Sequence, residues 1–466
     1  MAGAARGSNH EGAQARRERL SILSDAMTDG GSGGNVLELL PDTAAVGASG
    51  HLLIGGCDLV DLAIQYRTPL YVYDEATIRA RARAYREALR GAYSGTSLIC
   101  YAGKAYCAPW LLKVLASEQL GLDVVSGGEL YAAQRAGFPV QKIYFHGNNK
   151  SEDELFLALE AGVHRVVIDN LEEVERLSRL ATDRVLEQGV LLRVAPGVEA
   201  HTHAHILTGA PDTKFGVSID TGAARAAVEA IQRAPGLRLM GLHAHIGSQI
   251  FEVEPYQATV RKVFEFAADA GVELRELSPG GGFGVRYTAE DDQAQAPDAV
   301  AQVIADAVTR EAHHRGWELP ELTIEPGRSI VAPAAVALYR VGSVKEIAGV
   351  RTYVAVDGGM ADNIRPATYG ARYTAVLANR LCDPVTDTVA VAGRYCESGD
   401  VLIRDARLPR PAVGDLVAIP SAGAYQLSMA SNYNLVPRPA VVVVNDGQAR
   451  LVRRRETYDD LLAPEV

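Results

Sequence analysis

Residues 97–104 read Ser-Leu-Ile-Cys-Tyr-Ala-Gly-Lys, a short apolar run that ends in a glycine and a lysine. Such a run is typical of a buried strand, and the stretches between such runs carry Leu, Val and Ala at helical spacing, as in 152–161 and 171–180. This strand-then-helix alternation continues through residues 76–328. The other apolar runs are Leu122–Val125, Ile143–Phe145, Arg165–Ile168, Val190–Val194, Leu239–Ala244, Val272–Leu277 and Leu322–Ile324.

Eight strands in βα alternation over about 250 residues predict a TIM (β/α)8 barrel. A doubly wound open parallel sheet is the alternative. The barrel is favoured because no ninth or tenth element is needed to account for the pattern.

The pattern changes after residue 328. Short strand-like runs follow one another with Gly and Pro turns between them and few helical stretches, which predicts a mainly β domain over residues 329–466. Residues 36–75 also contain strand-like pieces, and Leu70–Tyr73 is expected to join the β domain. Residues 1–35 are rich in Gly, Ala, Ser and charge, so we expect a disordered tail. The runs after 328 are Val336–Val344, Thr352–Val356, Thr388–Val391, Val401–Ile403, Leu416–Ile419 and Val441–Val444.

Composition excludes several classes of protein. The 466 residues carry a net charge of −11 and no long Lys/Arg run, which argues against a nucleic-acid partner. The triplet Arg453–Arg455 precedes Glu456 and is interpreted as a solvated strand end. Five scattered cysteines without a CxxC pair argue against a disulfide framework or zinc site and indicate a reducing, cytoplasmic location. No apolar run reaches about 18 residues, so no membrane helix is expected.

Polar and glycine-rich segments follow the predicted strands. Barrel enzymes place their reactive groups on the loops after the strands, so these segments should meet at one rim. They are Lys104, His243–Ser248, Ser278–Gly284 and Glu325–Arg328. Together they predict a site for a phosphate-bearing cofactor.

Each of these residues also has a structural interpretation. Gly280–Gly282 offers free N–H groups to an anion, and this interpretation is favoured over that of a plain tight turn. The absence of GxGxxG and GxxxxGK[ST] spacing argues against a dinucleotide or nucleoside triphosphate. Lys104 is a candidate Schiff-base lysine if desolvation lowers its pKa, although a lone lysine is usually a surface charge. Glu325 needs a positive partner, which Arg328 or a protonated pyridine nitrogen would supply.

Histidine clusters raise the possibility of a metal. His201, His203 and His205 would share one face of a strand, but acidic co-ligands at suitable spacing are not evident. His243 and His245 are interpreted in the same way, with His245 preferred as a ring lying over a cofactor. We therefore expect no metal.

Taken together, these segments resemble the fold-type III pyridoxal-phosphate (PLP) decarboxylases, and within them the diaminopimelate decarboxylase family, which has ornithine and arginine decarboxylase relatives. The resemblance runs from about residue 68 to 462 and covers both predicted domains. Its motifs are 101–106, 122–130, 145–150, 214–216, 243–249, 280–284, 325–328, 396–400 and 423–425.

The resemblance implies a role for each matching residue. Lys104 carries PLP as a Schiff base, Glu325 pairs with the pyridine nitrogen, and His245 stacks on the ring. Cys396 is the proton donor, contributed by the partner subunit of a homodimer in which the active site is shared. The cofactor-binding residues are Lys104, His245, Ser248, Gly281, Gly282, Glu325, Pro326, Gly327, Arg328 and Tyr425; those for substrate are Arg328, Arg365, Tyr369, Glu397 and Tyr425.

The implied activity is that of a carboxy-lyase that converts meso-2,6-diaminopimelate to L-lysine and CO2, the last step of lysine biosynthesis. Arg365 suits a distal carboxylate, whereas a bare distal ammonium, as in ornithine, would require an acidic group there. The alternatives are a decarboxylase for another amino acid or conjugate with a distal carboxylate, and a catalytically silent regulator on the same fold.

Overall fold

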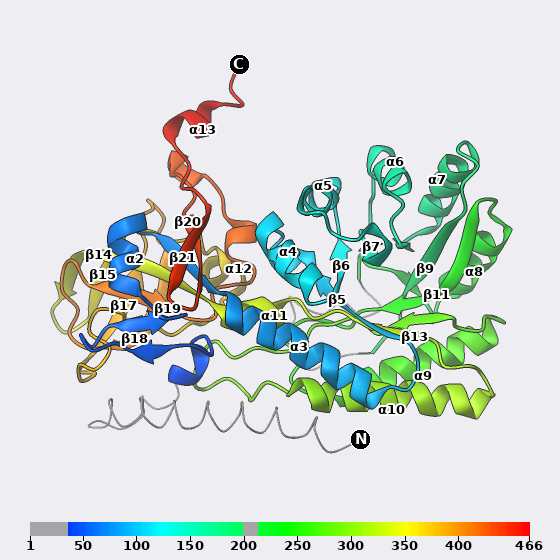
Figure 1. Ribbon diagram of the computed structural model, residues 1–466, viewed down its shortest axis with the longest axis horizontal. Coiled ribbons are helices and arrows are strands. Elements are labelled where there is room, and N and C mark those ends of the chain that lie inside the picture. Colours follow the sequence, from blue (N-terminus) through cyan, green and yellow to red (C-terminus); the bar gives the residue numbers. More distant parts are fainter. Residues whose placement is uncertain (1–35, 199–212) are drawn as a thin grey trace. The chain divides into compact units, whose positions relative to one another are not determined.

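The computed structural model describes residues 36–198 and 213–466, which form two compact units (Figure 1). The β unit contains the described residues up to Ile78, together with Arg286–Asp292 and Val331–Val466. The barrel unit contains Arg79–Val285 and Gln293–Ile330. The predicted tail over 1–35 and the run His201, His203 and His205 lie outside the described residues.

Within the described ranges, eight parallel strands close into a cylinder in the barrel unit. The first strand pairs with the last, and the fourth pairs with the fifth, so no edge is left open. The predicted TIM barrel is therefore confirmed. In order around the barrel the strands are β5 (Ser97–Ala102), β6 (Gly121–Val124), β7 (Ile143–Phe145), β8 (Arg165–Ile168), β9 (Gln188–Ala195), β11 (Leu237–Ala244), β12 (Glu276–Ser278) and β13 (Glu321–Ile324), with β10 (Val217–Ser218) added beside β9.

Helices follow the strands and lie around the outside of the cylinder (Figure 1). Local sequence explains several of their starts: Ser151 caps α6 in a capping box with Glu154, and the side chain of Asn170 caps α7. The helices are α3 (Glu75–Ala92), α4 (Pro109–Ser117), α5 (Gly127–Ala136), α6 (Glu152–Ala161), α7 (Leu171–Thr182), α8 (Ala223–Arg233), α9 (Glu254–Asp269), α10 (Pro297–Arg315) and α11 (Arg328–Val331), with 3-10 turns η3 (Gly103–Ala105) and η4 (Val140–Lys142).

The seventh strand is shorter than the sequence suggested. A strand was expected over Val272–Leu277, but β12 covers only Glu276–Ser278. Gly271 adopts a left-handed φ of 69° after α9, and the Val272 N–H donates to the Ala267 carbonyl at 2.8 Å. The first residues of the apolar run therefore close the preceding helix and are not available to pair in the sheet.

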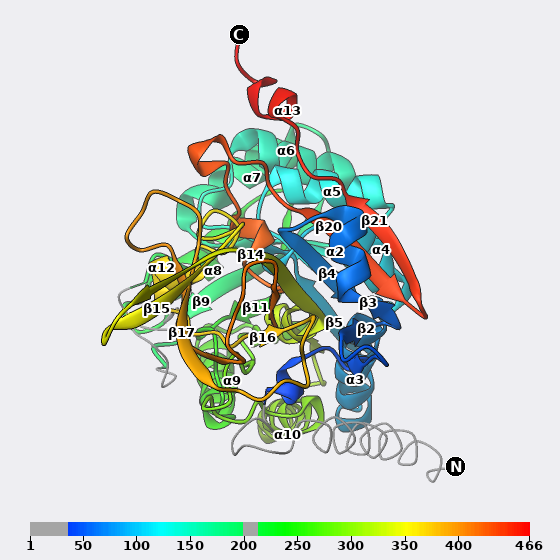
Figure 2. The same ribbon diagram turned by 90° about the vertical axis from the view of Figure 1, so that its left-hand side faces the viewer.

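The β unit is built on a long strand, β14 (Ala335–Ile347), whose ribbon is labelled in Figure 2. Strand β4 (Leu70–Asp74) pairs antiparallel with β14 and parallel with β20 (Ala440–Asn445). The expectation that Leu70–Tyr73 joins the β domain is thus confirmed. The further strands of this sheet are β15 (Arg351–Val356), β16 (Val376–Leu377), β17 (Asp387–Ala392), β18 (Val401–Leu408), β19 (Leu416–Ile419) and β21 (Gln448–Arg453).

A buried apolar cluster holds the β unit together. It joins Leu70 and Val72 of β4 with Val336 and Leu338 of β14 and Val442 of β20, all of them fully buried. The smaller elements of the β unit are η2 (Leu37–Leu39), β1 (Ala45–Val46), β2 (Leu52–Ile54), β3 (Cys57–Asp58), α2 (Leu59–Tyr66), η6 (Ala332–Ala334), α12 (Arg365–Tyr369), η7 (Leu427–Met429), η8 (Tyr433–Leu435) and α13 (Tyr458–Leu462).

None of the helices in the described part of the chain combines the length and the apolar character that crossing a bilayer requires.

A buried carboxylate in the β unit makes stability depend on pH. Asp362 accepts hydrogen bonds from the Tyr339 hydroxyl at 2.5 Å and from the Gly359 N–H at 2.9 Å. Burial raises the pKa of Asp362 to about 7, although these hydrogen bonds oppose the shift. The unfolded chain ionises this residue at lower pH than the folded chain does. The folded state therefore loses stability as pH rises from about 4 to about 7.

We predict that Asp362→Asn removes this loss, because a neutral amide is not penalised by burial and the Tyr339 hydroxyl can rotate to accept from it. The melting temperatures of wild type and variant, measured from pH 4 to pH 7.5, should diverge in favour of the variant as pH rises. Each unit of pKa shift corresponds to about 1.4 kcal/mol. A constant difference between the two proteins across this range would contradict the prediction.

Candidate active site

The carboxyl ends of β5 and β13 carry the two residues on which the predicted site depends. These strands are paired neighbours, with Ile324 opposite Ile99. Lys104 lies on η3, directly after β5, and Glu325 directly follows β13. The Ala102 N–H donates to the Pro326 carbonyl at 3.2 Å, so the backbone joins the two strand ends. The structure therefore brings Lys104 and Glu325 to the same rim of the barrel.

Glu325 is a buried carboxylate with protein donors on both oxygens. The Ser278 hydroxyl donates to Oε1 at 2.6 Å, and His243 Nε2 lies 3.0 Å from Oε1 and 3.3 Å from Oε2. Burial alone would raise the pKa of Glu325, but the interactions with His243 and Ser278 hold it well below its usual value. Glu325 is thus an ionised carboxylate at neutral pH.

The pKa of Asp123 is shifted in the opposite direction. It lies on β6 and is buried, and burial together with the charge of Glu325 raises its pKa well above the usual value. His146 Nε2 lies 3.5 Å from Asp123 Oδ1, and burial lowers the pKa of His146. The site therefore holds two buried carboxyl groups whose pKa values are shifted in opposite directions, a separation typical of catalytic sites.

His245 follows β11 and is neutral. Its Nδ1 accepts a hydrogen bond from the Gly281 N–H at 3.2 Å, so that nitrogen carries no proton. Burial, and next the nearby charge of Lys104, lower the pKa of His245 well below its usual value. A neutral ring in this place suits contact with a flat, electron-poor ligand.

Three glycine positions on this rim admit no side chain. A Cβ on Gly281 would lie 1.9 Å from the Glu325 carbonyl, one on Gly282 would lie 2.2 Å from the Gly247 carbonyl, and one on Gly327 would lie 2.9 Å from the Ala102 Cβ. Beside them, an Arg328 N–H donates to the Ser248 hydroxyl at 2.9 Å. Bare backbone, a hydroxyl and a guanidinium are the groups that bind a phosphate.

The remaining predicted site residues lie in the β unit. Arg365 begins α12 and is only 7% exposed, whereas Tyr369 at the end of that helix is exposed. Cys396 and Glu397 lie on the exposed loop before β18, where the Tyr433 hydroxyl donates to Glu397. Tyr425 is half-buried after β19, with a left-handed φ of 58°.

Known proteins share both the sequence and the fold. The family model for the pyridoxal binding domain of pyridoxal-dependent decarboxylases matches residues 75–332. Diaminopimelate decarboxylase of Bacillus subtilis is 47% identical over 427 residues, covering 91% of this chain and 97% of that protein. The chain belongs to the diaminopimelate decarboxylase family. The Synechocystis member is 45% identical over 435 residues, covering 91% of this chain and 92% of its own length.

Solved structures of the family agree with this assignment. Diaminopimelate decarboxylase of M. jannaschii superposes with a TM-score of 0.85 at 34% identity, covering 91% of this chain and 98% of that one. The Helicobacter pylori enzyme complexed with L-lysine gives 0.80 at 32% identity, covering 88% and 99%. A lysine/ornithine decarboxylase from Vibrio vulnificus, at 24% identity and a TM-score of 0.70, shares the fold.

The residues of the barrel rim fit the cofactor of this family. An ionised Glu325 matches a protonated ring nitrogen, a neutral His245 matches the ring face, and the glycines with Arg328 and Ser248 match a phosphate. Lys104 is exposed at this rim and would supply the amine.

Sequence reasoning missed part of this network. Asp123, His146 and Ser278 were read only as parts of motifs, and His243 only as a possible metal ligand. The atoms of His146, His243 and Glu325 do lie within 4.8 Å of one another, but both oxygens of Glu325 already contact protein donors. Asp123 is a charged residue inside the apolar run Leu122–Val125. That unusual position was the one signal in the sequence that could have identified it as a site residue.

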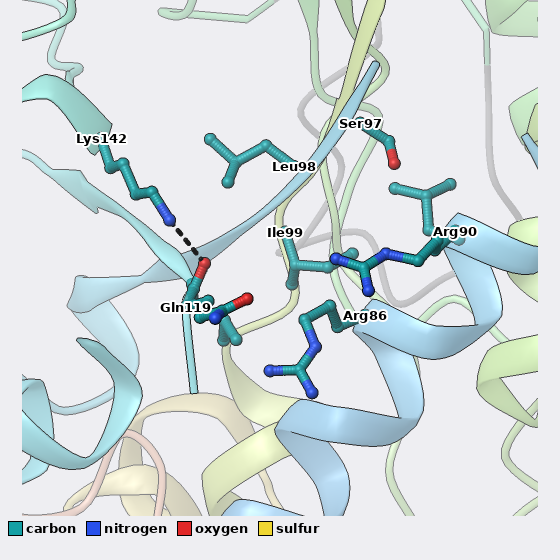
Figure 3. Close-up of a pocket in the computed structure, with 9 residues that line it drawn as sticks. Arg86, Arg90, Ser97, Leu98, Ile99, Gln119 and Lys142 are labelled. Carbon is teal, nitrogen blue, oxygen red and sulfur yellow. Dashed lines mark hydrogen bonds between the residues drawn. The ribbon is translucent and has the colours of Figure 1, made fainter. Parts of the chain in front are cut away.

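A separate pocket lies at the opposite end of β5 (Figure 3). It is lined by Arg86 and Arg90 of α3, the strand's first residues Ser97–Ile99, and Lys142, which donates to the Gln119 carbonyl at 3.0 Å. Lys104 follows the other end of this strand, roughly 17 Å of extended chain away. The pocket is therefore not part of the candidate site.

We predict that Glu325→Gln lowers kcat roughly a hundredfold, because a neutral amide of the same size cannot compensate a buried positive ring nitrogen, a loss of about 3 kcal/mol. PLP should still bind, since Lys104, Gly281 and Gly282 are unchanged. Steady-state kinetics and the absorbance of bound PLP test both statements. Glu321→Gln, at the other end of β13, is the matched control. Wild-type kcat in Glu325→Gln would refute the assigned role.

Proposed function

We propose that this enzyme uses PLP to decarboxylate meso-2,6-diaminopimelate to L-lysine and CO2, the final step of lysine biosynthesis. Its family membership supports the reaction class, and the barrel rim supports the cofactor. The choice of substrate rests on Arg365.

Arg365 is a buried cation whose described neighbours are aromatic. Its guanidinium lies 4.8 Å from the Tyr287 ring centroid and 5.7 Å from that of Tyr373, and it donates to the Tyr373 hydroxyl at 2.6 Å. No carboxylate of the described residues forms an ion pair with it. A buried guanidinium is costly without an anion, so this residue suits a substrate with a second carboxylate.

In this proposal, each site residue has a separate role in the reaction. Bound PLP supplies an electron-withdrawing ring that accepts the electron pair left when CO2 departs. Lys104 would hold the cofactor through its side-chain amine, and the carboxylate of Glu325 would pair with the ring nitrogen. Arg365, with Arg328, Tyr369 and Glu397, orients the distal end of the substrate. The thiol of Cys396 delivers a proton to Cα, and Tyr425 borders the cofactor.

Two further features belong to this proposal. The enzyme acts as a homodimer in which Cys396 of one subunit serves the barrel of the other, as the family resemblance implies. It works in the cytoplasm, which agrees with five cysteines that are all free.

We predict that Lys104→Ala abolishes turnover and covalent attachment of PLP. Borohydride reduction of the wild type should add the cofactor mass to the peptide containing Lys104, and the variant should show no such peptide. Lys113→Ala, an exposed lysine on α4, is the control and should behave as the wild type. Full CO2 release by Lys104→Ala would overturn the mechanism.

A substrate panel separates this proposal from a decarboxylase for another amino acid. CO2 release should be fastest from meso-diaminopimelate, and slow or absent from ornithine, arginine and lysine, which lack the second carboxylate. Arg365→Ala should lower kcat/KM for meso-diaminopimelate roughly a hundredfold through loss of a buried charge partner. Arg372→Ala, an exposed arginine close by, is the control. Equal rates with ornithine would reject the substrate assignment.

A further inference from the structure

Two loops of the β unit carry residues with proposed roles at the substrate. The first, residues 358–365, ends in Arg365 and is called the arginine loop. The second, residues 393–400, contains Cys396 and Glu397 and is called the cysteine loop. Asp400 ends the cysteine loop, directly before β18. No role has yet been given to this residue, although its side chain is buried.

The Asp400 carboxylate binds both loops at once. Oδ1 accepts the Met360 N–H of the arginine loop at 2.7 Å, and Oδ2 accepts the Tyr395 N–H at 2.8 Å, one residue before Cys396. Backbone hydrogen bonds reinforce the arrangement: Gly393 N–H donates to the Asp400 carbonyl at 2.9 Å, and Arg394 N–H donates to the Gly358 carbonyl at 3.0 Å.

Glycines on both loops leave room for this carboxylate. A Cβ on Gly393 would lie 2.2 Å from Asp400 Oδ2, and a Cβ on Gly359 would lie 2.6 Å from Oδ1. Gly359 also has a φ of 153°, which favours glycine. Each loop therefore has a glycine, which carries no side chain, at the point where it approaches Asp400.

We propose that Asp400 is a positioning residue that holds Cys396 and Arg365 in a fixed relation within the β unit. The inference rests on the proposed function, because it assumes that Cys396 donates the proton and that Arg365 binds the distal carboxylate. Asp400 itself does not touch the substrate. It acts through two peptide N–H groups that lie one residue from Cys396 and five residues from Arg365.

The chemistry of the contact requires a carboxylate. Both partners are backbone N–H groups, which donate only, and a carboxylate accepts on both oxygens. An asparagine of the same shape would direct its own NH2 at one of these donors and leave that N–H unpaired in a buried place. The Asp400→Asn substitution therefore breaks one of the two connections without changing the volume of the side chain.

We expect Asp400→Asn to lower kcat and to raise KM for meso-diaminopimelate, together roughly tenfold or more in kcat/KM, because small displacements of reacting groups are costly. The rate at which iodoacetamide alkylates Cys396 should change severalfold, as read from peptide mass spectra. Cys382, which is also exposed, provides an internal reference. Reducible PLP on Lys104 should remain at the wild-type level, because that residue lies in the barrel unit.

Two further variants make the outcome decisive. Asp405→Asn, an exposed position on β18, should match the wild type in every measurement. Gly393→Ala places a methyl group against Asp400 while keeping its charge, and it should reproduce the effects of Asp400→Asn; it decides the matter if Asp400→Asn does not fold. The proposal is overturned if either kcat/KM or the Cys396 alkylation rate stays at the wild-type value in the folded variant.

Failure of the proposed function would look different. It would appear as no CO2 release from meso-diaminopimelate by the wild type itself. The alkylation rates of Cys396 in the wild type, Asp400→Asn and Gly393→Ala would still report whether Asp400 holds the cysteine loop.

Discussion

Glu325 must remain ionised where the chain excludes water from it. Removing a carboxylate from water costs several kcal/mol, and a lone buried carboxyl would respond by taking up a proton. Ser278 and His243 prevent this by contacting both oxygens of Glu325. The pKa of Asp123 is shifted the other way, because its burial and its proximity to Glu325 favour the neutral form. An ionised Glu325 at this end of the barrel suits a cationic ring nitrogen, as the proposed function requires.

The rest of the rim is arranged around that charge by close backbone approaches. Gly281 and Gly282 come so near to the Glu325 and Gly247 carbonyls that no side chain would fit, and Gly281 fixes the neutral form of His245. The contact between Ala102 and Pro326 ties the strand before Lys104 to the strand before Glu325. The geometry of the cofactor residues is therefore a property of the backbone, with few long side chains to reorient.

In the β unit, too, a buried carboxylate accepts hydrogen bonds from separate segments of the chain, and here it connects two loops. Asp400 accepts peptide N–H groups from two loops, and each loop carries a glycine that makes room for it. Arg365, enclosed by Tyr287 and Tyr373, keeps a buried positive charge available for an anion. In both units a buried charge is stabilised by neighbours contributed by separate segments of the chain, and the reactive groups are positioned by that arrangement.

Sequence alone determined the elements whose signals are local. The barrel strands from β5 to β9, the helix α6, and the contribution of Leu70–Tyr73 to the β sheet followed from apolar runs, helical spacing and turn residues. The motifs at the strand ends also indicated the family. The exposed edge strand β21 was not among the predicted strands, apart from its end at Arg453, because half of its residues are polar. The start of β12 was misplaced because Val272 closes a helix. Tertiary structure alone decided the pKa shifts of Glu325, Asp123 and His245, the burial of Arg365 and the contact of Asp400 with two loops. The physical reason is that burial and hydrogen bonding depend on neighbours far away in the chain, such as His243 and Glu325, whose meeting is set by closure of the barrel and not by any local pattern.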